Sequence, residues 1–178
     1  MNRDQINALA VLWVEGDQNA FSKLYDHFVD KIYRFVFFKV PNEEAFDLTE
    51  NVFVKVLENR EYYAVKKGSF STWIYTIARN TVIDFYRVSK THLDLDEIID
   101  LPDNQQDVEL KVEGVLNSEI LKDAISKLPQ KYQDMIVLRF IDDMSYSEIA
   151  DICDKTEVSI RVDIHRALKK LKIELKDL

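Results

Sequence analysis

Polar side chains with possible nucleic-acid chemistry recur along one segment of the first half of the chain. Asn80, Asp84 and Arg87 follow one another at steps of four and three residues, which places them on one face of a helix. Several cations and aromatic residues lie near them in the sequence: Tyr62, Tyr63, Lys66, Lys67, Tyr75, Arg79 and Tyr86. Aromatic rings interleaved with cations can hold the unstacked bases of single-stranded DNA.

Two structural alternatives remain open for these residues. Asp84 and Arg87 can form an ion pair on a solvated surface, which would contribute little to stability. The tyrosines can instead be half-buried members of a helical core, because a tyrosine ring packs well while its hydroxyl reaches a polar partner.

A second group of cations follows a clear helix-start signal near the C-terminal end. Ser145 and Glu148 have the spacing of a capping box, and Asp154 is a residue that tolerates a left-handed turn. Thr156 can then cap a longer helix, whose basic residues are Arg161, Arg166, Lys169, Lys170 and Lys172. A short helix, a tight turn and a longer basic helix predict a helix-turn-helix that enters the major groove. The alternative is an ordinary helical hairpin with a solvated basic face.

The sequence gives little support for a catalytic or metal-binding site. His27, His92 and His165 are far apart in the sequence, and the chain contains no glycine-rich phosphate loop. A single cysteine, Cys153, excludes an internal disulfide framework and a four-cysteine zinc site. The sequence therefore predicts a protein that is not an enzyme and uses no cofactor or metal.

The N-terminal residues carry acids and lack the basic segment and apolar run of a secretory signal. No stretch reaches the roughly 18 apolar residues of a membrane span. We therefore expect a cytoplasmic protein without membrane insertion.

Helices are the expected elements throughout. The 178 residues include only three Gly and three Pro, too few for a turn-rich sandwich or barrel. Apolar residues recur with helical spacing over 20–36, 48–57 and 70–85, and again over 120–128, 132–140, 149–153 and 160–171. Pro129 suits the first turn of a helix. The sequence predicts an all-α fold.

An acidic segment divides the chain. Nine acids and one base lie between Thr91 and Ile120, so this segment alone carries a net charge of −8, equal to that of the whole chain. We predict two small helical domains, 1–93 and 118–178, joined by an acidic linker over 94–117. The linker is either a solvated tether or a DNA-mimicking strand that lies in a basic channel of a partner.

Four segments together resemble the extracytoplasmic-function (ECF) sigma factors of the sigma-70 family. They are GDQNAFSKLYDHFVDKIYRFV, EEAFDLTENVFVKVLEN, FSTWIYTIARNTVIDFYR and AISKLPQKYQDMIVLRFIDDMSYSEIADICDKTEVSIRVDIHRALKKL, in the order and spacing of that family. The resemblance covers nearly all of the chain except the linker. It implies a sigma region 2 bundle, a sigma region 4 helix-turn-helix, and a factor that directs promoter recognition, DNA melting and transcription initiation.

The resemblance also implies roles for particular residues. The clamp helices of the largest polymerase subunit would bind Asp47, Leu48, Glu50, Asn51 and Phe53, although Phe53 can equally be core. The minus-10 DNA would be contacted by Lys66, Lys67, Arg79, Asn80, Asp84 and Arg87, with the loop over 64–71 cradling a flipped base. The minus-35 DNA would be read by Ser159, Arg161, Val162, Asp163, Arg166 and Lys169, while the second domain sits on the flap of the second-largest subunit. An anti-sigma factor is a further partner that the resemblance implies.

The last helix departs from the family pattern. Val158 and Val162 stand where small or polar residues are usual, and Asp163 replaces a usual base. An acid near phosphates is repulsive unless it accepts from a cytosine amino group. With all three near the DNA, we predict weak or altered minus-35 reading that needs minus-10 contacts or another DNA-bound partner.

One rival function uses the same fold without initiation. A helical regulatory binder could sequester a polymerase subunit or an anti-sigma protein. Such a binder would have no need of the polar and basic residues predicted to contact minus-10 DNA, and this distinguishes the two hypotheses.

Overall fold

The computed structural model describes residues 1–63, 68–90 and 118–176. Every regular element in these ranges is helical, which confirms the predicted all-α fold. The proposed linker over 94–117 and two predicted DNA contacts, Lys66 and Lys67, lie outside the described residues. No helix in the described ranges is long and apolar enough to cross a membrane.

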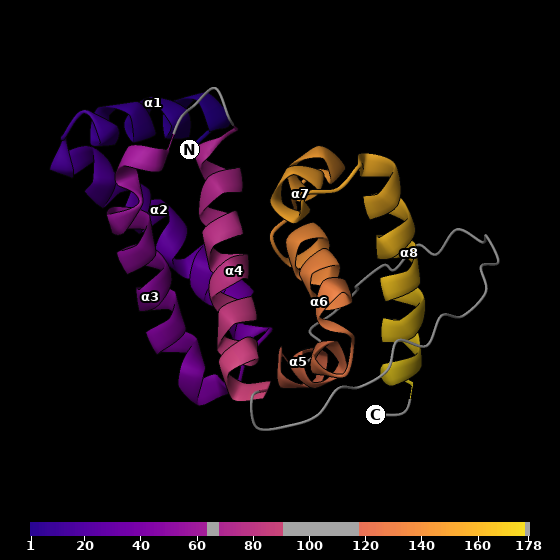
Figure 1. The fold of residues 1–178 in the computed structure, drawn as a ribbon. Coiled ribbons are helices and arrows are strands. Elements are labelled where there is room, and N and C mark those ends of the chain that lie inside the picture. The colour runs from indigo at the N-terminus through magenta and orange to yellow at the C-terminus, as the bar shows by residue number, and fades with distance from the viewer. Residues whose placement is uncertain (64–67, 91–117, 177–178) are drawn as a thin grey trace.

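In the residues that the structure describes, the first domain is a bundle of four α-helices with two short 3-10 turns (Figure 1). Its elements are α1 (Arg3–Val14), α2 (Gln18–Phe37), η1 (Asn42–Glu44), α3 (Ala45–Glu58), η2 (Arg60–Tyr62) and α4 (Phe70–Lys90). Asn2 begins α1 in a capping box with Gln5, and the Asp17 carboxylate begins α2 by accepting from two backbone amides. The apolar stripe of α2 is buried as its spacing predicts: Ala20, Leu24, Phe28, Ile32, Phe35 and Val36.

The second domain contains α5 (Ser118–Ser126), α6 (Gln130–Ile136), a π-helical turn η4 (Val137–Ile141), α7 (Tyr146–Cys153) and α8 (Glu157–Glu174). The predicted signals are present: Ser145 and Glu148 form the capping box of α7, Asp154 is left-handed at φ +53°, and the Thr156 side chain caps α8. These local features produce the helix-turn-helix of α7 and α8.

The end of α6 differs from its simple periodic pattern. The backbone amide of Asp142 donates to the carbonyl of Val137 at 3.0 Å, which closes a wider turn than an α-helix has. This extra residue rotates the end of the element, so Phe140, which the spacing predicts as core, is 44% exposed. The same rotation brings Asp142 to the other domain.

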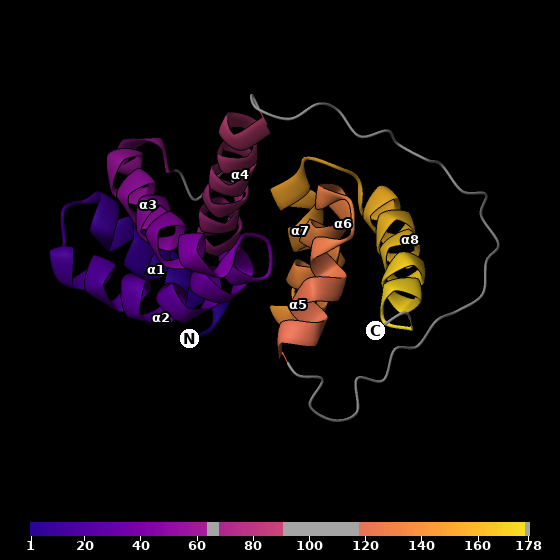
Figure 2. The same cartoon turned by 90° about the horizontal axis from the view of Figure 1, so that it is seen from below.

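The two domains pack against each other. Helix α4 contacts α7, and α2 contacts η4. Figures 1 and 2 show α6 and α7 beside α4, with α8 on the far side of the second domain. The contact between domains therefore covers one side of α4 and leaves α8 away from the first domain.

Candidate nucleic-acid interface

The polar face of α4 is present and solvent-accessible. Asn80 is exposed. Asp84 forms ion pairs with Arg87 at 3.2 Å and with Lys55 at 3.5 Å. The surface ion pair between Asp84 and Arg87, considered above as an alternative, is confirmed. Because the side chains of Asp84 and Arg87 are 46% and 78% exposed, this pair contributes little to stability.

The tyrosines near this face divide between core and surface. Tyr62 is 76% exposed, whereas Tyr63 and Tyr75 are buried in the core. The hydroxyl of Tyr86 donates to the backbone carbonyl of Lys39 at 2.6 Å. Burial raises the pKa of Tyr63 and Tyr86. Tyr62 is thus the ring in this group best placed to stack on a base.

The start of α4 is held from two sides. Ser69 caps it by accepting from the Thr72 amide at 3.1 Å, and Asn7 of α1 accepts from the Phe70 amide at 3.0 Å. Beside this helix end lies an opening of about 460 Å³. Residues of both domains line it, among them Tyr62, Thr76, Asp151, Asp154 and Lys155.

Helix α8 presents an exposed basic and apolar face. Val158, Arg161, Val162 and Lys169 are exposed, and Ser159 and Arg166 are half-buried. The guanidinium of Arg161 lies 4.1 Å from the centre of the Tyr146 ring, which links this face to α7. These residues come from one helix with free access to solvent, as a major-groove contact requires.

Asp163 does not lie on that face, contrary to the sequence-based expectation. Its side chain is 10% exposed and accepts from the Lys155 ammonium at 2.6 Å. Lys155 follows the left-handed residue of the turn, so it reaches back to α8. The acid is therefore neutralised inside the helix-turn-helix, and its repulsion of DNA is much smaller than an exposed acid would cause.

The predicted polymerase contacts on α3 fall into two groups. Asp47, Glu50 and Asn51 are exposed, whereas Leu48 and Phe53 are buried, with the Phe53 ring 4.7 Å from that of Tyr25. Sequence reasoning missed two exposed apolar residues of the same helix, Phe46 and Val54, and it placed Leu57 on the apolar stripe, although Leu57 is 50% exposed. Their spacing from Glu50 by four, four and seven residues was the available signal.

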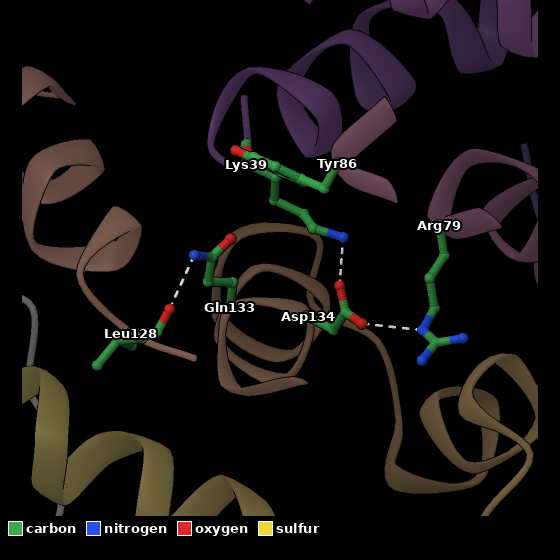
Figure 3. A network of polar contacts seen from close by, with 6 residues as sticks. All are labelled: Lys39, Arg79, Tyr86, Leu128, Gln133 and Asp134. Carbon is green, nitrogen blue, oxygen red and sulfur yellow. Dashed lines mark hydrogen bonds and ion pairs between the residues drawn. The ribbon is translucent and has the colours of Figure 1, made fainter. Parts of the chain in front are cut away.

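A buried ion-pair cluster connects the domains through Asp134 of α6 (Figure 3). Its carboxylate accepts from the Lys39 ammonium and, through its other oxygen, from Nε of Arg79 at 2.8 Å. The Lys39 and Asp134 side chains are 0% and 2% exposed. Burial lowers the pKa of Lys39, and the Asp134 carboxylate opposes that shift. No sequence pattern signals this cluster, because its members are far apart in the chain.

A second ion pair crosses the same contact. Arg34 of α2 donates to Asp142 at 3.1 Å, and the Asp142 side chain is 1% exposed. Burial raises the pKa of Asp142, although Arg34 acts in the opposite direction. Close to the Asp134 cluster, Cys153 is buried, and burial raises its pKa to about 11, so it remains an unreactive thiol. Among the described residues, no group of His, Cys, Asp and Glu could hold a metal ion.

The two domains match the models of two different protein families. Residues 24–91 match Sigma-70 region 2, and residues 118–171 match Sigma-70, region 4. The helical bundle with its exposed α4 face, joined to a helix-turn-helix, therefore defines a sigma factor of the sigma-70 type.

Similar individual proteins show which group of sigma-70 factors the chain resembles. The chain is 33% identical over 175 residues to the ECF RNA polymerase sigma factor SigW of Bacillus subtilis, covering 92% of this chain and 93% of SigW. It is 31% identical over 159 residues to the ECF RNA polymerase sigma factor BldN of Streptomyces coelicolor, covering 88% of this chain and 60% of BldN. The chain belongs to the ECF sigma factors of the sigma-70 family.

Solved structures share the fold. CnrH, solved in complex with the cytosolic domain of CnrY, superposes with a TM-score of 0.71 at 21% identity, over 97% of this chain and 98% of CnrH. The sigma factor RpoE of Bartonella quintana, solved with the anti-sigma factor NepR, gives a TM-score of 0.70 at 19% identity, over 88% of this chain and 96% of RpoE.

Membership of this family establishes the activity. The protein is an RNA polymerase sigma factor that directs promoter recognition and transcription initiation, and the family is non-enzymatic. Core RNA polymerase and promoter DNA are the partners that the family implies.

Proposed function

We propose that three exposed faces divide the work of initiation: α4 for minus-10 DNA, α3 for the polymerase clamp helices, and α8 for minus-35 DNA. The observation that carries the proposal is the exposed position of Asn80 and Arg87 on α4, the helix whose start borders the opening next to Tyr62. A rigid helix that presents an exposed amide and guanidinium can contact phosphate, and the exposed ring near the start of that helix can hold an unstacked base.

At the minus-10 element, Asn80, Arg87 and Arg79 would contact the DNA, with Lys66 and Lys67 contributing from the loop before α4. Asp84 would act by orienting Arg87, to which it lies 3.2 Å away, rather than by meeting phosphate itself. Unstacking a base costs a few kcal/mol, which stacking on an aromatic ring partly offsets.

On α3, we assign the clamp contact to the exposed polar residues Asp47, Glu50 and Asn51. Leu48 and Phe53 support them from the core, because their side chains are buried. Apolar Phe46, Val54 and Leu57 extend this face and are available to lose solvent contact on binding. The second domain would sit on the flap of the second-largest subunit.

At the minus-35 element, Val158, Ser159, Arg161, Val162, Arg166 and Lys169 would read or position the DNA. The weaker minus-35 reading expected from the sequence stays a prediction, but its basis is narrower. Asp163 is paired with Lys155, so two exposed valines remain as the departures that bear on base reading. A DNA-bound partner would be needed only if these valines fail to supply specificity.

We further propose regulation by an anti-sigma factor. Two structural neighbours with the same fold were solved in complex with such partners: CnrH with the cytosolic domain of CnrY, and RpoE with NepR. Isolation of the tagged protein from uninduced cells, followed by mass spectrometry, should recover a stoichiometric inhibitor.

Since a sigma factor must reach core polymerase, we assign the chain to the cytoplasm.

The decisive experiment is reconstitution with core polymerase and mapping of transcript starts on a genomic library. Aligned starts are expected with the intact chain. Asn80→Ala should reduce open complexes at these promoters while leaving polymerase binding intact, and Glu50→Ala should reduce polymerase binding. Asn19→Ala, an exposed change in the first turn of α2, serves as the control. Equal open-complex formation by Asn80→Ala and the intact chain would remove the α4 assignment.

A further inference from the structure

Two apolar side chains face solvent near the start of α8. Val158 is 72% exposed and Val162 is 39% exposed, and their spacing of four residues places both on one face of the helix. Valine forms helices less well than alanine or lysine, so helix stability does not account for these residues. Other side chains of α8 fill the core of the domain: Ile160, Ile164, Ala167, Leu168 and Leu171.

The charged side chains around the two valines have partners within the chain. The guanidinium of Arg161 lies 4.1 Å from the centre of the Tyr146 ring and 3.8 Å from the Glu157 carboxylate. The Asp163 carboxylate is turned inward onto the Lys155 ammonium at 2.6 Å. The two isopropyl groups, in contrast, are open to contact with another molecule.

The valines stand where a helix-turn-helix meets bases. In such motifs the N-terminal residues of the second helix contact base edges in the major groove. Val158 and Val162 occupy the second and sixth positions of α8, which begins at Glu157. Helix α8 lies on the side of the second domain away from α4 (Figures 1 and 2). The first domain therefore does not obstruct the approach of duplex DNA to this face.

An isopropyl group distinguishes bases through the base atoms that it covers. A valine over an amino group or a carbonyl oxygen takes that group out of water without supplying a hydrogen bond, which is unfavourable. Thymine alone presents an apolar methyl group in the major groove. A valine over this methyl removes apolar surface of both partners from water. The side chain thus favours thymine over the other three bases.

The spacing of the valines limits how far apart two such methyl groups can lie. Four residues of an α-helix rise about 6 Å along its axis. Stacked bases along a DNA strand are about 3.4 Å apart. The two contacts therefore span no more than about two base-pair steps.

We propose that Val158 and Val162 determine base specificity in the minus-35 element by selecting the methyl groups of two thymines within this span. The inference rests on the proposed function of α8. The cations of the helix supply affinity through phosphates, and the valines supply a preference between bases. The departure of this helix from the family pattern is then an altered reading, in which apolar contacts with methyl groups do part of what hydrogen bonds would do.

The test removes single methyl groups from the DNA and keeps its base pairs. Holoenzyme reconstituted with core polymerase binds a promoter fragment taken from the mapped transcript starts. One thymine of its minus-35 element at a time is replaced by uracil, which lacks the C5 methyl but has the same hydrogen-bonding groups. Affinity is measured by competition against the unmodified fragment. Loss of one buried methyl contact should weaken binding about fourfold.

Two thymines should respond in this way, and replacing both should weaken binding about tenfold or more. Val162→Ala should abolish the uracil effect at one of the two positions, and Val158→Ala should abolish it at the other. Ile173→Ala, which truncates an exposed apolar residue near the other end of α8, is the matched control and should keep both effects. Each substitution changes an exposed side chain, so folding should be little affected.

Three results would overturn the inference: a minus-35 element without thymine, an element whose thymines can all be replaced by uracil at no loss of affinity, and uracil effects that both valine variants retain. Failure of the proposed function looks different. A holoenzyme that binds the promoter equally well after the whole minus-35 element is scrambled would remove the assignment of α8 to this DNA.

Discussion

At the level of single residues, the effect of a charged side chain on DNA binding depends on its ion-pair partner within the chain. Asp163 looks repulsive to DNA in the sequence, yet its carboxylate is buried against the Lys155 ammonium at 2.6 Å. The same applies to Arg79, which reads as a DNA contact and lies on Asp134 of the other domain. Side-chain type gives the charge in each case, but the ion-pair partner determines whether that charge is available to DNA.

Asp163→Asn tests the inward position of this acid. The change leaves the Lys155 ammonium without its carboxylate, so urea denaturation should show the second domain about 1 kcal/mol less stable, a modest value because Lys155 is one-third exposed. Minus-35 duplex affinity should change less than twofold. A large gain in affinity without loss of stability would mean that Asp163 faces DNA after all. Glu157→Gln, an exposed acid of the same helix, is the comparison for removing a negative charge.

At the level of elements, capping decides where the helix-turn-helix begins and turns. The Ser145 side chain accepts from the Glu148 amide at 3.2 Å, while Glu148 accepts from the Ser145 amide at 3.0 Å. Asp154 ends α7 with a left-handed backbone. These contacts are local in sequence, which explains why the sequence predicted them correctly.

Ser145→Ala should destabilise the second domain by about 1 kcal/mol, because α7 loses the acceptor for one of its first amides. Denaturation followed by circular dichroism measures the change. Ser147→Ala, at an exposed position within the first turn of α7, should change stability by only a few tenths of a kcal/mol. Equal effects of the two substitutions would show that the capping contact contributes nothing.

The turn itself offers a separate prediction. Asp154→Gly should keep or increase stability, since glycine adopts a φ of +53° without steric cost, whereas Asp154→Val should lose about 1–2 kcal/mol. Thermal denaturation distinguishes the two variants. A more stable valine variant would indicate that the turn is not left-handed in solution.

At the level of the whole molecule, two acids of one domain hold three cations of the other. Arg34 and Arg79 remain partly accessible, while Lys39 is fully enclosed. Burying such charges is favourable only when each is paired, so loss of one member disturbs the contact more than loss of a surface pair would. The domains are therefore joined by a few specific interactions that a single substitution can weaken.

Arg34→Ala should partly separate the domains, because Asp142 stays buried without its cation. The expansion expected in small-angle X-ray scattering is modest, since the Arg34 side chain is already 45% exposed. Lys23→Ala, which removes an exposed cation of the same helix, should leave the scattering unchanged. Identical scattering from both variants would show that the Arg34 pair does not hold the domains.

Short-range patterns were enough to predict the helices, the helix-turn-helix and the family. Caps and apolar stripes act within a few residues, so the buried face of α2 and the capping box at Ser145 follow directly from spacing. The exposed position of Asn80 also follows, because a helix determines which residues share a face. Family motifs then supplied the activity, which helix spacing could not.

The pairing of distant charges, in contrast, depends on the folded chain. Asp134 lies 95 residues from Lys39 and 55 from Arg79 in the sequence, and periodicity places each on a helix face without saying which other face it will contact. The π-helical turn that carries Asp142 to Arg34 likewise breaks the period on which spacing arguments depend. Long-range pairing depends on how whole helices pack, so the contact of Asp134 with Arg79 and the packing of α7 against α4 could be seen only in the tertiary structure.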